Sequence, residues 1–303
     1  MRILLTGATG FLGSHLAEVL LEAGHTLLLT KRNLSDLWGC STFIGSCTWI
    51  NTDEEQWQDE VIVFQPEAII NTAWEGVSAG GRNDWEVQLS NISFQQTLLS
   101  IADKAATKLF IGLGSQAEYG CFDGCIPESY PTNPTTAYGA TKLASLNLLK
   151  AFCTEKEIRW LWFRLFSCFG EREGKQWLIP STIQNILTKE SMDATLGEQR
   201  YAYLYVKDVA RIIAQVLEQE APSDIYHISA EMSCSIKELV SSIRDCINPD
   251  FPIYFGAIPY RGNQSMLMQG DMRKTNNYLN DFTFADFDES LRKTIAYYKK
   301  QQG

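Results

Sequence analysis

The sequence predicts an α/β fold, in which helices cover both faces of a doubly wound parallel sheet, joined to a smaller, interleaved C-terminal lobe. From Arg2 to Leu165, short runs that are apolar throughout alternate with longer segments of helical character. Strands without polar alternation are typical of a parallel sheet that is buried on both faces. Beyond Gly170 this alternation ends in a charged loop over 171–175. The regular part therefore forms the sheet, and the irregular part indicates the second lobe.

Length, composition and charge narrow the function classes. With 303 residues, of which 45% are hydrophobic and 12% aromatic, the chain suits one main domain with a smaller lobe and has ample material for a core. Its formal net charge of −10 argues against a broad basic surface for nucleic acid or for an anionic membrane. No apolar run approaches the roughly 18 residues that cross a bilayer, so we expect a cytoplasmic protein without a membrane partner.

Cysteines and histidines do not indicate a metal centre. The eight cysteines contain no Cys-x-x-Cys pair, and the three histidines lie far apart in the chain. This usage favours reduced, mostly buried thiols, with a disulfide between Cys121 and Cys125 as the weaker alternative. We therefore predict no metal site.

The apolar pattern places the elements in order. A strand over 2–6 comes first, and further strands are expected over 25–30, 48–51, 68–73, 109–113 and 160–165. Helices are expected over 54–64, 84–105 and 136–154, and a helix over 206–219 with a strand over 225–228 is expected to return to the sheet. We predict a sheet domain over 1–170, with 201–228 returning to it, and a second lobe over 171–200 and 229–303.

The turn after the first strand has the composition of a phosphate site. Glycines stand at 7, 10 and 13, directly between a strand and a helix. Gly7 allows backbone angles that are forbidden to other residues, Gly10 lets a pyrophosphate approach the backbone, and Gly13 lets the helix lie close to the strand. The free N–H groups of the helix start then face the phosphates. An ordinary surface turn is the alternative, but the position favours dinucleotide binding by a Rossmann-type domain, with contacts from Gly7, Thr9, Gly10, Phe11 and Leu12.

The end of the second strand bears on the ribose of the cofactor. An acidic residue there binds a free 2′-hydroxyl, whereas a cation accommodates a 2′-phosphate. The sequence at this place is Thr30-Lys31-Arg32-Asn33, and the next carboxylate is Asp36. We therefore favour NADP(H), with contacts from Lys31 and Arg32 and from Asn51 at the end of the third strand. NAD(H) is the alternative, because both cations are also compatible with a solvated strand end.

A tyrosine and a lysine share one face of a predicted helix. Tyr138 and Lys142 are four residues apart, and a nearby ammonium lowers the pKa of a phenol, which suits proton transfer. The same spacing recurs in Tyr203 and Lys207, but Tyr203 belongs to an alternating aromatic run that predicts a strand. Ser115 follows the fifth strand, at the sheet edge where ligands bind, and its hydroxyl can donate to a carbonyl that is being reduced. An ordinary turn serine is the alternative there.

Further motifs accompany these residues. They are Ser115 four residues before Tyr119-Gly120, the stretch Arg164-Leu165-Phe166-Ser167, and the stretch Tyr205-Val206-Lys207-Asp208-Val209. Together with the glycine turn and the Tyr138–Lys142 pair, they resemble the extended short-chain dehydrogenase/reductases over nearly the whole chain. These are NAD(P)-dependent epimerases, dehydratases and reductases of nucleotide sugars. Within the family, the stretches over 196–199 and from 255 onward most resemble the CDP-abequose synthase-like reductases, which reduce a CDP-linked 4-keto-deoxyhexose.

The resemblance implies a role for each matching position. Ser115, Tyr138 and Lys142 would form the catalytic triad, and Lys142 would also hold the nicotinamide ribose. Arg261 would clamp the substrate pyrophosphate, for which a forked guanidinium is suited, with a surface arginine as the alternative interpretation. Further cofactor contacts would come from Ala73, Trp74, Leu113, Leu165 and Phe166, and further substrate contacts from Gln116, Ser167, Trp177, Ile179 and Pro180.

Three positions depart from the family pattern. Family dehydratases carry Asp-Glu after the catalytic hydroxyl, whereas Ser115 is followed by Gln116-Ala117, which disfavours loss of water from the sugar. Many relatives place an arginine at the position of Tyr201, so the neighbouring Arg200 is the candidate for that substrate contact. The bulk of Trp74 beside the cofactor is expected to narrow the sugar site.

The sequence therefore favours an NADP(H)-dependent reductase of a nucleotide-activated 4-keto-6-deoxy sugar. A nicotinamide hydride would go to the sugar carbonyl, with Tyr138 as proton donor, Ser115 polarising the oxygen and Lys142 keeping Tyr138 acidic. The alternative is an NAD-dependent nucleotide-sugar 4-epimerase that uses the same residues. A third class, a redox-sensing regulator that keeps the fold without the chemistry, is disfavoured because Tyr138 and Lys142 are retained.

Two of the predicted helices resemble those that pair into a four-helix bundle in homodimers of the family. We therefore expect a homodimer through the helices over 84–105 and 136–154. The alternative is that their apolar positions serve the core of the chain itself. These positions are Leu89, Ile92, Leu98, Leu143, Leu146 and Leu149.

Overall fold

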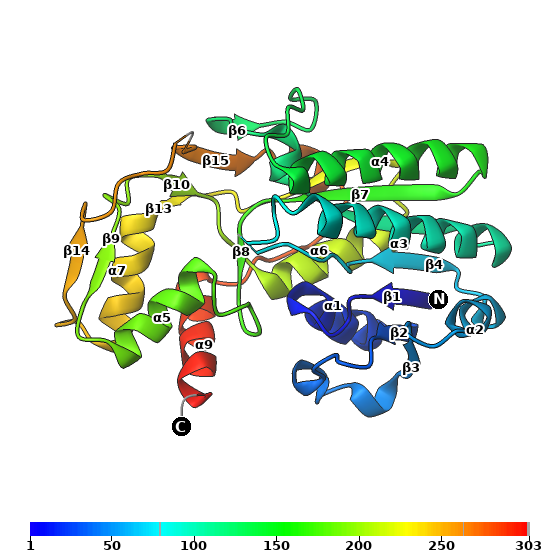
Figure 1. Ribbon diagram of the computed structural model, residues 1–303, viewed down its shortest axis with the longest axis horizontal. Coiled ribbons are helices and arrows are strands. Elements are labelled where there is room, and N and C mark those ends of the chain that lie inside the picture. Colours follow the sequence, from blue (N-terminus) through cyan, green and yellow to red (C-terminus); the bar gives the residue numbers. More distant parts are fainter. Residues whose placement is uncertain (79, 263, 302–303) are drawn as a thin grey trace.

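The computed structural model describes residues 1–78, 80–262 and 264–301. Within them, seven parallel strands form one sheet in the order β12-β7-β5-β4-β1-β2-β3, and the order reverses beside β1 (Figure 1). This confirms the predicted doubly wound α/β fold. The strands are β1 (Arg2–Thr6), β2 (Thr26–Lys31), β3 (Thr48–Asn51), β4 (Ala68–Asn71), β5 (Leu109–Ser115), β7 (Arg159–Leu165) and β12 (Asp224–Ile228).

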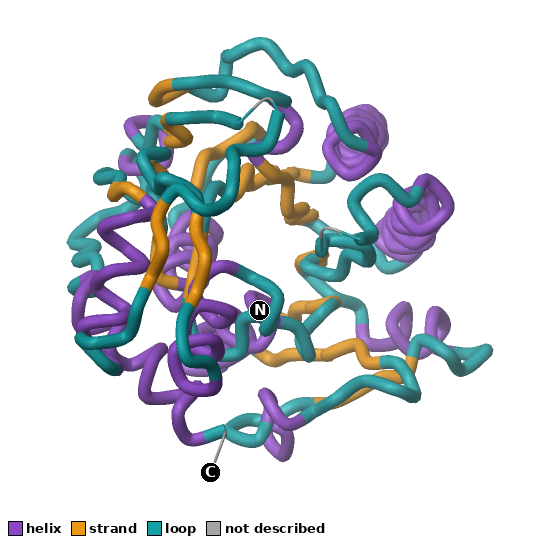
Figure 2. The backbone as a smooth tube through the Cα atoms, turned by 60° about the vertical axis from the view of Figure 1, so that its left-hand side comes forward, coloured by secondary structure: helices purple, strands orange, loops and turns teal. Residues whose placement is uncertain are grey.

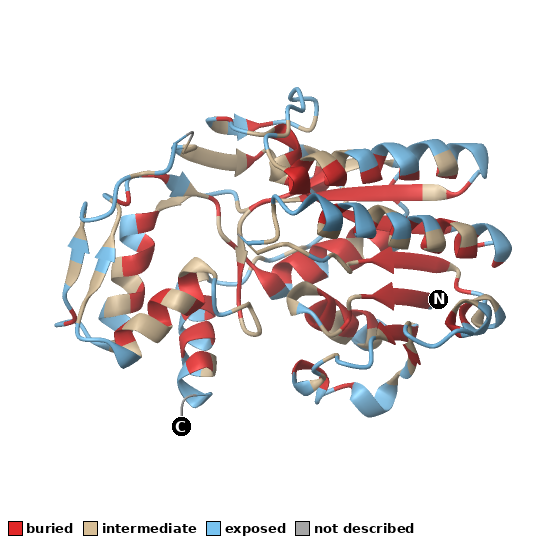
Figure 3. Ribbon diagram, in the orientation of Figure 1, coloured by how far each residue is buried: buried red, intermediate tan, exposed pale blue. Residues whose placement is uncertain are grey.

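Alternate residues of a strand serve two different layers of the core. In β1, Ile3 and Leu5 belong to one apolar cluster and Leu4 to another, because a strand projects successive side chains to opposite faces. Figure 2 shows helices on both sides of the strands, and Figure 3 shows that the strands between them are buried. One layer holds α1 (Phe11–Glu22) and α6 (Val206–Glu218), and the other holds α2 (Trp57–Phe64), α3 (Trp85–Lys104) and α4 (Ala137–Glu155).

The carboxyl ends of the central strands meet at one edge of the sheet. Thr6 of β1 pairs in register with Asn71 of β4, and Ser115 of β5 pairs with Leu165 of β7. The Thr6 hydroxyl also donates a 2.6 Å hydrogen bond to Oδ1 of Asn71. In open parallel sheets, ligands bind outside this edge, at the point where the strand order reverses. The topology therefore brings the glycine turn, Ser115 and Leu165 to one place.

A second lobe stands beyond this edge, at the left of Figure 1. Its own apolar cluster includes Ile183, Ile243 and Ile295, which come from three different helices. A two-stranded sheet and a four-stranded sheet complete the lobe and its contact with the main sheet. The helices of the lobe are α5 (Leu178–Thr188), α7 (Ile236–Ile247) and α9 (Phe287–Lys300). Its strands are β9 (Met192–Ala194) and β14 (Ile253–Phe255) in the two-stranded sheet, and β6 (Gly124–Ile126), β10 (Arg200–Tyr201), β13 (Cys234–Ser235) and β15 (Leu267–Gly270) in the four-stranded sheet. The short helix α8 (Arg273–Asn276) packs beside β12.

The aromatic run over 201–205 differs from the strand that its alternation predicts. It is divided between β10 and β11 (Leu204–Tyr205), which pair with different partners. β10 lies between β13 and β15, whereas β11 pairs with β8 (Cys168–Phe169). The alternation was misleading because the chain passes here from one small sheet to another. Tyr203 lies between the two strands.

None of the helices that the structure describes is long and apolar enough to cross a membrane. In the same residues, no group of three or more His, Cys, Asp or Glu side chains is arranged to hold a metal ion.

Candidate active site

A cleft of about 1210 Å³ lies between the carboxyl edge of the main sheet and the second lobe. Both lobes contribute to its walls, and most of the residues predicted from the sequence line it. From the cofactor set these are Gly10, Phe11, Leu12, Trp74, Leu113, Tyr138, Lys142, Leu165 and Phe166; from the substrate set they are Ser115, Gln116, Ser167, Trp177, Ile179 and Arg261.

The glycine turn forms one end of the cleft and has the geometry of an anion site. Gly7 has a φ of 71°, and its carbonyl accepts a 2.9 Å hydrogen bond from the Gly10 N–H. A Cβ on Gly13 would lie 2.1 Å from that same carbonyl oxygen, so the helix approaches the strand more closely than any side chain allows. Helix α1 begins after Gly10 without a side-chain cap and without an acidic residue in its first turn. Its N–H groups therefore fit a pyrophosphate.

The end of β2 lies beside this turn, outside the lining of the cleft. Arg32 is exposed and forms an ion pair with Glu75. The Lys31 carbonyl accepts a 2.9 Å hydrogen bond from the Thr52 N–H. Nδ2 of Asn51 donates a 2.6 Å hydrogen bond to Asn33. The two cations thus stand at the sheet edge where the sequence places them, and Arg32 already has a carboxylate partner.

Ser115 is fixed by a capping box at the end of β5. Its Oγ accepts a 3.2 Å hydrogen bond from the Ala117 N–H, and its own N–H donates a 2.9 Å hydrogen bond to Glu118. Tyr138, in the first turn of α4, lines the same cleft from the other wall. Predicted from separate segments, Ser115 and Tyr138 therefore meet in the cleft.

Tyr138 is buried, and burial raises the pKa of its phenol because the charged form loses its solvation. The positive charge of Arg82 opposes this rise, and the neighbouring Ser115 hydroxyl also lowers the pKa. The guanidinium carbon of Arg82 lies 4.7 Å from the centroid of the Tyr138 ring. The sequence predicts this role for Lys142; of the two cations, Arg82 lies closer to the Tyr138 ring.

Lys142 points to the backbone of β5 instead. Its Nζ donates a 2.6 Å hydrogen bond to the Leu113 carbonyl and lies 3.5 Å from the centroid of the Trp74 ring, but 5.9 Å from that of the Tyr138 ring. Burial lowers the pKa of Lys142 to about 7, because the interior disfavours the ammonium. Tyr138 and Lys142 lie on one helix face, as their i, i+4 spacing predicts. The Lys142 amine nevertheless points to the Leu113 carbonyl, because a buried amine needs a hydrogen-bond acceptor.

Gln88 of α3 joins three walls of the site. Its side chain is fully buried, and its Oε1 accepts hydrogen bonds from Trp74 Nε1 at 3.0 Å and from the Thr141 hydroxyl at 3.4 Å. Its Nε2 donates to the carbonyls of Gly76 and Gly81, at 2.9 and 3.0 Å. These bonds hold the loop that follows β4 against α4, and they fix the indole of Trp74 beside Lys142.

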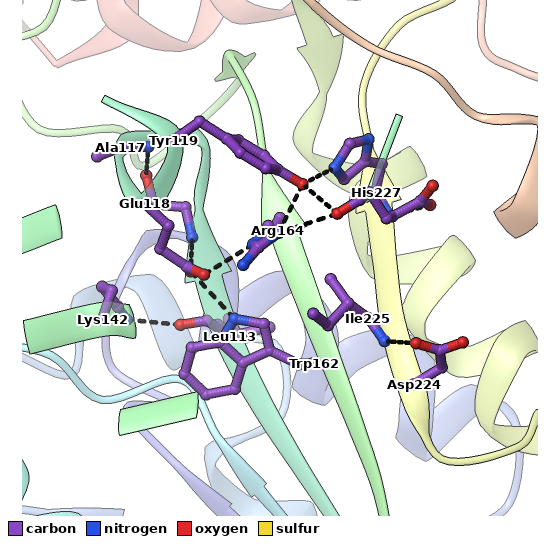
Figure 4. A network of polar contacts seen from close by, with 12 residues as sticks. Leu113, Ala117, Glu118, Tyr119, Lys142, Trp162, Arg164, Asp224, Ile225 and His227 are labelled. Atoms are coloured by element: carbon purple, nitrogen blue, oxygen red, sulfur yellow. Dashed lines mark hydrogen bonds and ion pairs between the residues drawn. The ribbon is translucent and has the colours of Figure 1, made fainter. Parts of the chain in front are cut away.

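A buried ion pair lies behind Ser115. Oε2 of Glu118 accepts a 2.7 Å hydrogen bond from Arg164, and both side chains are at most 2% exposed (Figure 4). Oε1 of Glu118 accepts from Trp162 Nε1 at 3.0 Å as well as from the Ser115 N–H. Arg164 also donates to the Tyr119 hydroxyl at 2.6 Å. Both oxygens of this carboxylate are thus occupied, so Glu118 positions Ser115 and is not free to act as a base.

Some predicted residues lie away from the cleft wall. Arg200 is exposed. Its guanidinium donates a 2.6 Å hydrogen bond to the Ser233 carbonyl and another to the Glu238 carboxylate. Tyr201, the next residue of β10, lines the cleft instead, because successive strand residues face opposite sides. This corrects the assignment of Arg200 to the substrate. The others outside the lining are Gly7, Thr9 and Ala73 in or behind the glycine turn, Lys31, Arg32 and Asn51 at the strand ends, and the buried Pro180 in α5.

Sequence reasoning missed several residues of the cleft, among them Arg82, Glu173 and Tyr203. Arg82 and Glu173 lie in irregular loops, and Tyr203 was assigned to strand packing although it lines the cleft. Oε2 of Glu173 is buried without a hydrogen-bond partner among the described residues, and burial raises its pKa to about 8. Its carboxyl is therefore mostly protonated at neutral pH. Neither loop has a periodicity that could have predicted which side chain faces inward.

Comparisons with known proteins agree with this geometry. The model of the NAD dependent epimerase/dehydratase family matches residues 3–229. CDP-abequose synthase of Salmonella muenchen is 25% identical over 271 residues, which cover 88% of this chain and 87% of that protein. UDP-glucose 4-epimerase of Thermotoga maritima, solved with UDP-glucose, has a TM-score of 0.89 at 21% identity and covers 100% of both chains. dTDP-glucose 4,6-dehydratase of Streptomyces venezuelae, solved with NAD and TYD, has a TM-score of 0.86 at 21% identity and covers 100% of this chain and 98% of that one.

The matched segment spans the glycine turn, the Ser115 loop and the helix that carries Tyr138 and Lys142. The solved structures show the same fold over the whole chain. Together these findings confirm the resemblance that the motifs indicated. The chain belongs to the NAD dependent epimerase/dehydratase family, the extended short-chain dehydrogenase/reductases that modify nucleotide sugars with NAD(P).

Proposed function

We propose that the protein is an NADP(H)-dependent reductase of a nucleotide-activated 4-keto-6-deoxy sugar. The observation that carries the proposal is the pair of Ser115 and Tyr138, which line the cleft together without a free carboxylate directly after the serine. Gln116 and Ala117 occupy those places, and both oxygens of Glu118 are engaged. Such a site can protonate an oxygen but lacks the acid–base pair that elimination of water requires.

Ser115, Tyr138 and Lys142 each have a separate role in the proposed reduction. When bound along the cleft, the reduced nicotinamide supplies a hydride to the sugar carbonyl carbon. Ser115 donates a hydrogen bond to the carbonyl oxygen, and Tyr138 transfers its proton to that oxygen as the hydride arrives. Lys142, buried between Leu113 and Trp74, is placed to hold the nicotinamide ribose.

The cofactor preference rests on the end of β2. Lys31 and Arg32 stand there, and Asp53 accepts a 2.8 Å hydrogen bond from the Asn33 N–H. An exposed guanidinium with one carboxylate partner remains able to meet a 2′-phosphate, because an exposed ion pair is weak. These cations support NADP(H) over NAD(H).

The second lobe is proposed to hold the nucleotide and the sugar. Trp177, Ile179 and Arg261 line the cleft on that side, and Ser167 lines it from the end of β7. Arg261 would meet the pyrophosphate, since a guanidinium binds phosphate oxygens through two parallel hydrogen bonds. The name of the relative from Salmonella muenchen supports a CDP-linked sugar. We propose a division into a dinucleotide domain of 1–170 with 201–228, and a substrate lobe of 171–200 and 229–303, although β6 pairs with strands of the second lobe.

A homodimer through α3 and α4 is proposed as the assembly. Trp85 and Leu89 on α3 and Leu148 on α4 are exposed, at 57%, 54% and 49%. Leu98, Leu146 and Leu149 are buried and serve the core, so part of the predicted apolar stripe is already used within the chain. The exposed apolar positions support pairing of these helices with a second copy.

The experiment is to incubate the purified protein with a panel of nucleotide-linked 4-keto-6-deoxy sugars and NADPH or NADH, and to determine the stereochemistry of the product. We expect NADPH oxidation with one sugar of the panel, through a cofactor that exchanges freely, and loss of this activity in Tyr138→Phe. Tightly retained NAD that does not exchange, with interconversion of 4-epimers, would instead establish the 4-epimerase. No turnover at all, with a Tyr138→Phe variant that behaves like the wild type in cells, would favour the regulator.

A further inference from the structure

Arg82 lies in the loop between β4 and α3 and reaches the ring of Tyr138. Its guanidinium carbon is 4.7 Å from the centroid of that ring. Arg82 also lines the cleft. Its Nε is buried and has no hydrogen-bond partner among the described residues. A buried donor without a partner costs about 1–3 kcal/mol, so its presence in the cleft points to a functional constraint.

The backbone holds Arg82 and Tyr138 in a fixed relation. The Arg82 carbonyl accepts a 2.9 Å hydrogen bond from the Tyr138 N–H, and Oδ1 of Asn83 accepts from the Ala137 N–H at 3.3 Å. The Arg82 N–H donates a 3.1 Å hydrogen bond to the Ser78 carbonyl. The Gln88 side chain donates hydrogen bonds to the carbonyls of Gly76 and Gly81 in the same loop. The loop is therefore tied to the first turn of α4, and the guanidinium stays beside the phenol.

The charges that face Tyr138 leave Arg82 as its cation. From β5 and its cap come the Ser115 hydroxyl and the Glu118 carboxylate, and Glu118 is already paired with Arg164. From α4 comes Lys142, whose Nζ is turned to the Leu113 carbonyl. The loop after β4 contributes Arg82 itself. Proton transfer from Tyr138 leaves a phenolate in a buried site, and an isolated buried anion is costly unless a cation or donor meets it.

We propose that Arg82 is a further catalytic residue, whose guanidinium stabilises the Tyr138 phenolate that forms when the phenol gives its proton to the sugar oxygen. This inference rests on the proposed role of Tyr138 as proton donor. The step is balanced: the hydride forms the C–H bond, the phenol O–H bond breaks, the sugar hydroxyl forms, and the negative charge remains on the Tyr138 oxygen beside Arg82. The same charge makes the phenol a stronger acid before the step.

The first experiment needs no substrate. Tyrosine labelled with ¹³C at Cζ is incorporated, the Tyr138 signal is assigned with Tyr138→Phe, and its titration is followed in the wild type, Arg82→Met and Arg82→Lys. Removing an opposite charge at this range raises a pKa by about 1–3 units. We expect that rise in Arg82→Met, a smaller one in Arg82→Lys, and none in the control Arg244→Met, whose arginine pairs with Asp245 on the surface of α7. A Tyr138 signal with the same midpoint in all proteins, or without a titration in the wild type, overturns the assignment.

The second experiment measures turnover against pH with the sugar that the wild type reduces. We expect kcat of Arg82→Met to fall by about 10- to 100-fold, with the KM for NADPH unchanged, and the limb that reports Tyr138 to move to higher pH. Arg82→Lys should recover part of kcat, and thermal unfolding shows whether each variant keeps its fold. A wild type that reduces no sugar contradicts the proposed function. An active wild type with an unaltered Arg82→Met contradicts the inference on Arg82 alone.

Discussion

The Nζ of Lys142 donates a 2.6 Å hydrogen bond to the carbonyl oxygen of Leu113, one turn of helix away from the tyrosine with which the lysine shares a face. This bond ties α4 to the carboxyl end of β5 at the centre of the cleft. It also places a basic group where burial opposes its charge, and the pKa of Lys142 is lowered to about 7. The Lys142 amine, which is expected to hold the cofactor, therefore lowers the stability of the cofactor-free protein.

Replacing Lys142 by Met should make the stability of the protein less dependent on pH. In the unfolded chain a lysine has a pKa near 10.4, so between about pH 7 and 10 the unfolded state binds more protons than the folded state. The free energy of unfolding of the wild type therefore increases as pH rises through this window. Below the window, the folded state bears the full cost of burying the charged Lys142 ammonium. At about 1.4 kcal/mol per pKa unit, the stability difference between Lys142→Met and the wild type should fall by about 4 kcal/mol from pH 7 to pH 10.

Urea unfolding of the cofactor-free protein at a series of pH values measures this difference. Lys150→Met is the control, because Lys150 is an exposed lysine of the same helix and should show no such trend. At the upper end of the window Lys142→Met should be the less stable protein, since the Leu113 carbonyl then lacks its donor. A difference that stays constant across the window would contradict the burial of a neutral amine.

Replacing Glu118 by Gln should destabilise the fold strongly. The change leaves the Arg164 guanidinium buried without a carboxylate, and breaking a buried ion pair on one side costs about 3–5 kcal/mol. Urea unfolding at neutral pH measures the loss. Glu86→Gln, at an exposed position in the first turn of α3, is the matched control and should change stability by less than about 0.5 kcal/mol. Equal stabilities of the two variants would mean that the pair contributes nothing to the fold.

Replacing Gly13 by Ala should damage both stability and cofactor binding. The new Cβ would lie 2.1 Å from the Gly7 carbonyl oxygen and 2.7 Å from the Thr72 hydroxyl, so α1 must move away from the turn. Overpacking of this kind costs about 1–3 kcal/mol, and the shift also displaces the N–H groups that face the phosphates. Calorimetric titration with NADPH and urea unfolding measure the two effects. Gly45→Ala, where an added Cβ meets no atom within 4 Å, should leave both unchanged.

Replacing Arg32 by Gln should weaken NADPH binding while leaving NADH binding unchanged. A charge-assisted hydrogen bond to the 2′-phosphate is worth about 1.5–3 kcal/mol, which corresponds to a rise in Kd for NADPH of roughly tenfold or more. Glu75→Gln is the complementary variant, because it removes the carboxylate that competes for Arg32, and it should tighten NADPH binding. Fluorescence titration with both cofactors checks this, and an equal loss of affinity for NADPH and NADH in Arg32→Gln would place the phosphate elsewhere.

The patterns that act over short range were sufficient to predict the architecture and part of the site. Strands that are apolar throughout gave the parallel sheet, because only a sheet that is buried on both faces tolerates them. The turn with Gly7 and Gly13 was predicted because its close approach excludes any side chain. Ser115 and Tyr138 were placed together because one follows a strand and the other begins a helix at the same edge of the sheet.

Contacts between distant segments decided the rest. Arg82 lies beside Tyr138 because backbone hydrogen bonds join an irregular loop to the start of α4, and irregular loops carry no periodicity from which this could be predicted. The choice between Arg200 and Tyr201 as the residue that faces the cleft depended on the pairing of β10 with its neighbours. Local sequence thus determined the sheet, the glycine turn and the choice of Tyr138 as the proposed proton donor. The tertiary structure alone determined which cation stands beside that donor, because electrostatic partners are set by distance in space and not by separation along the chain.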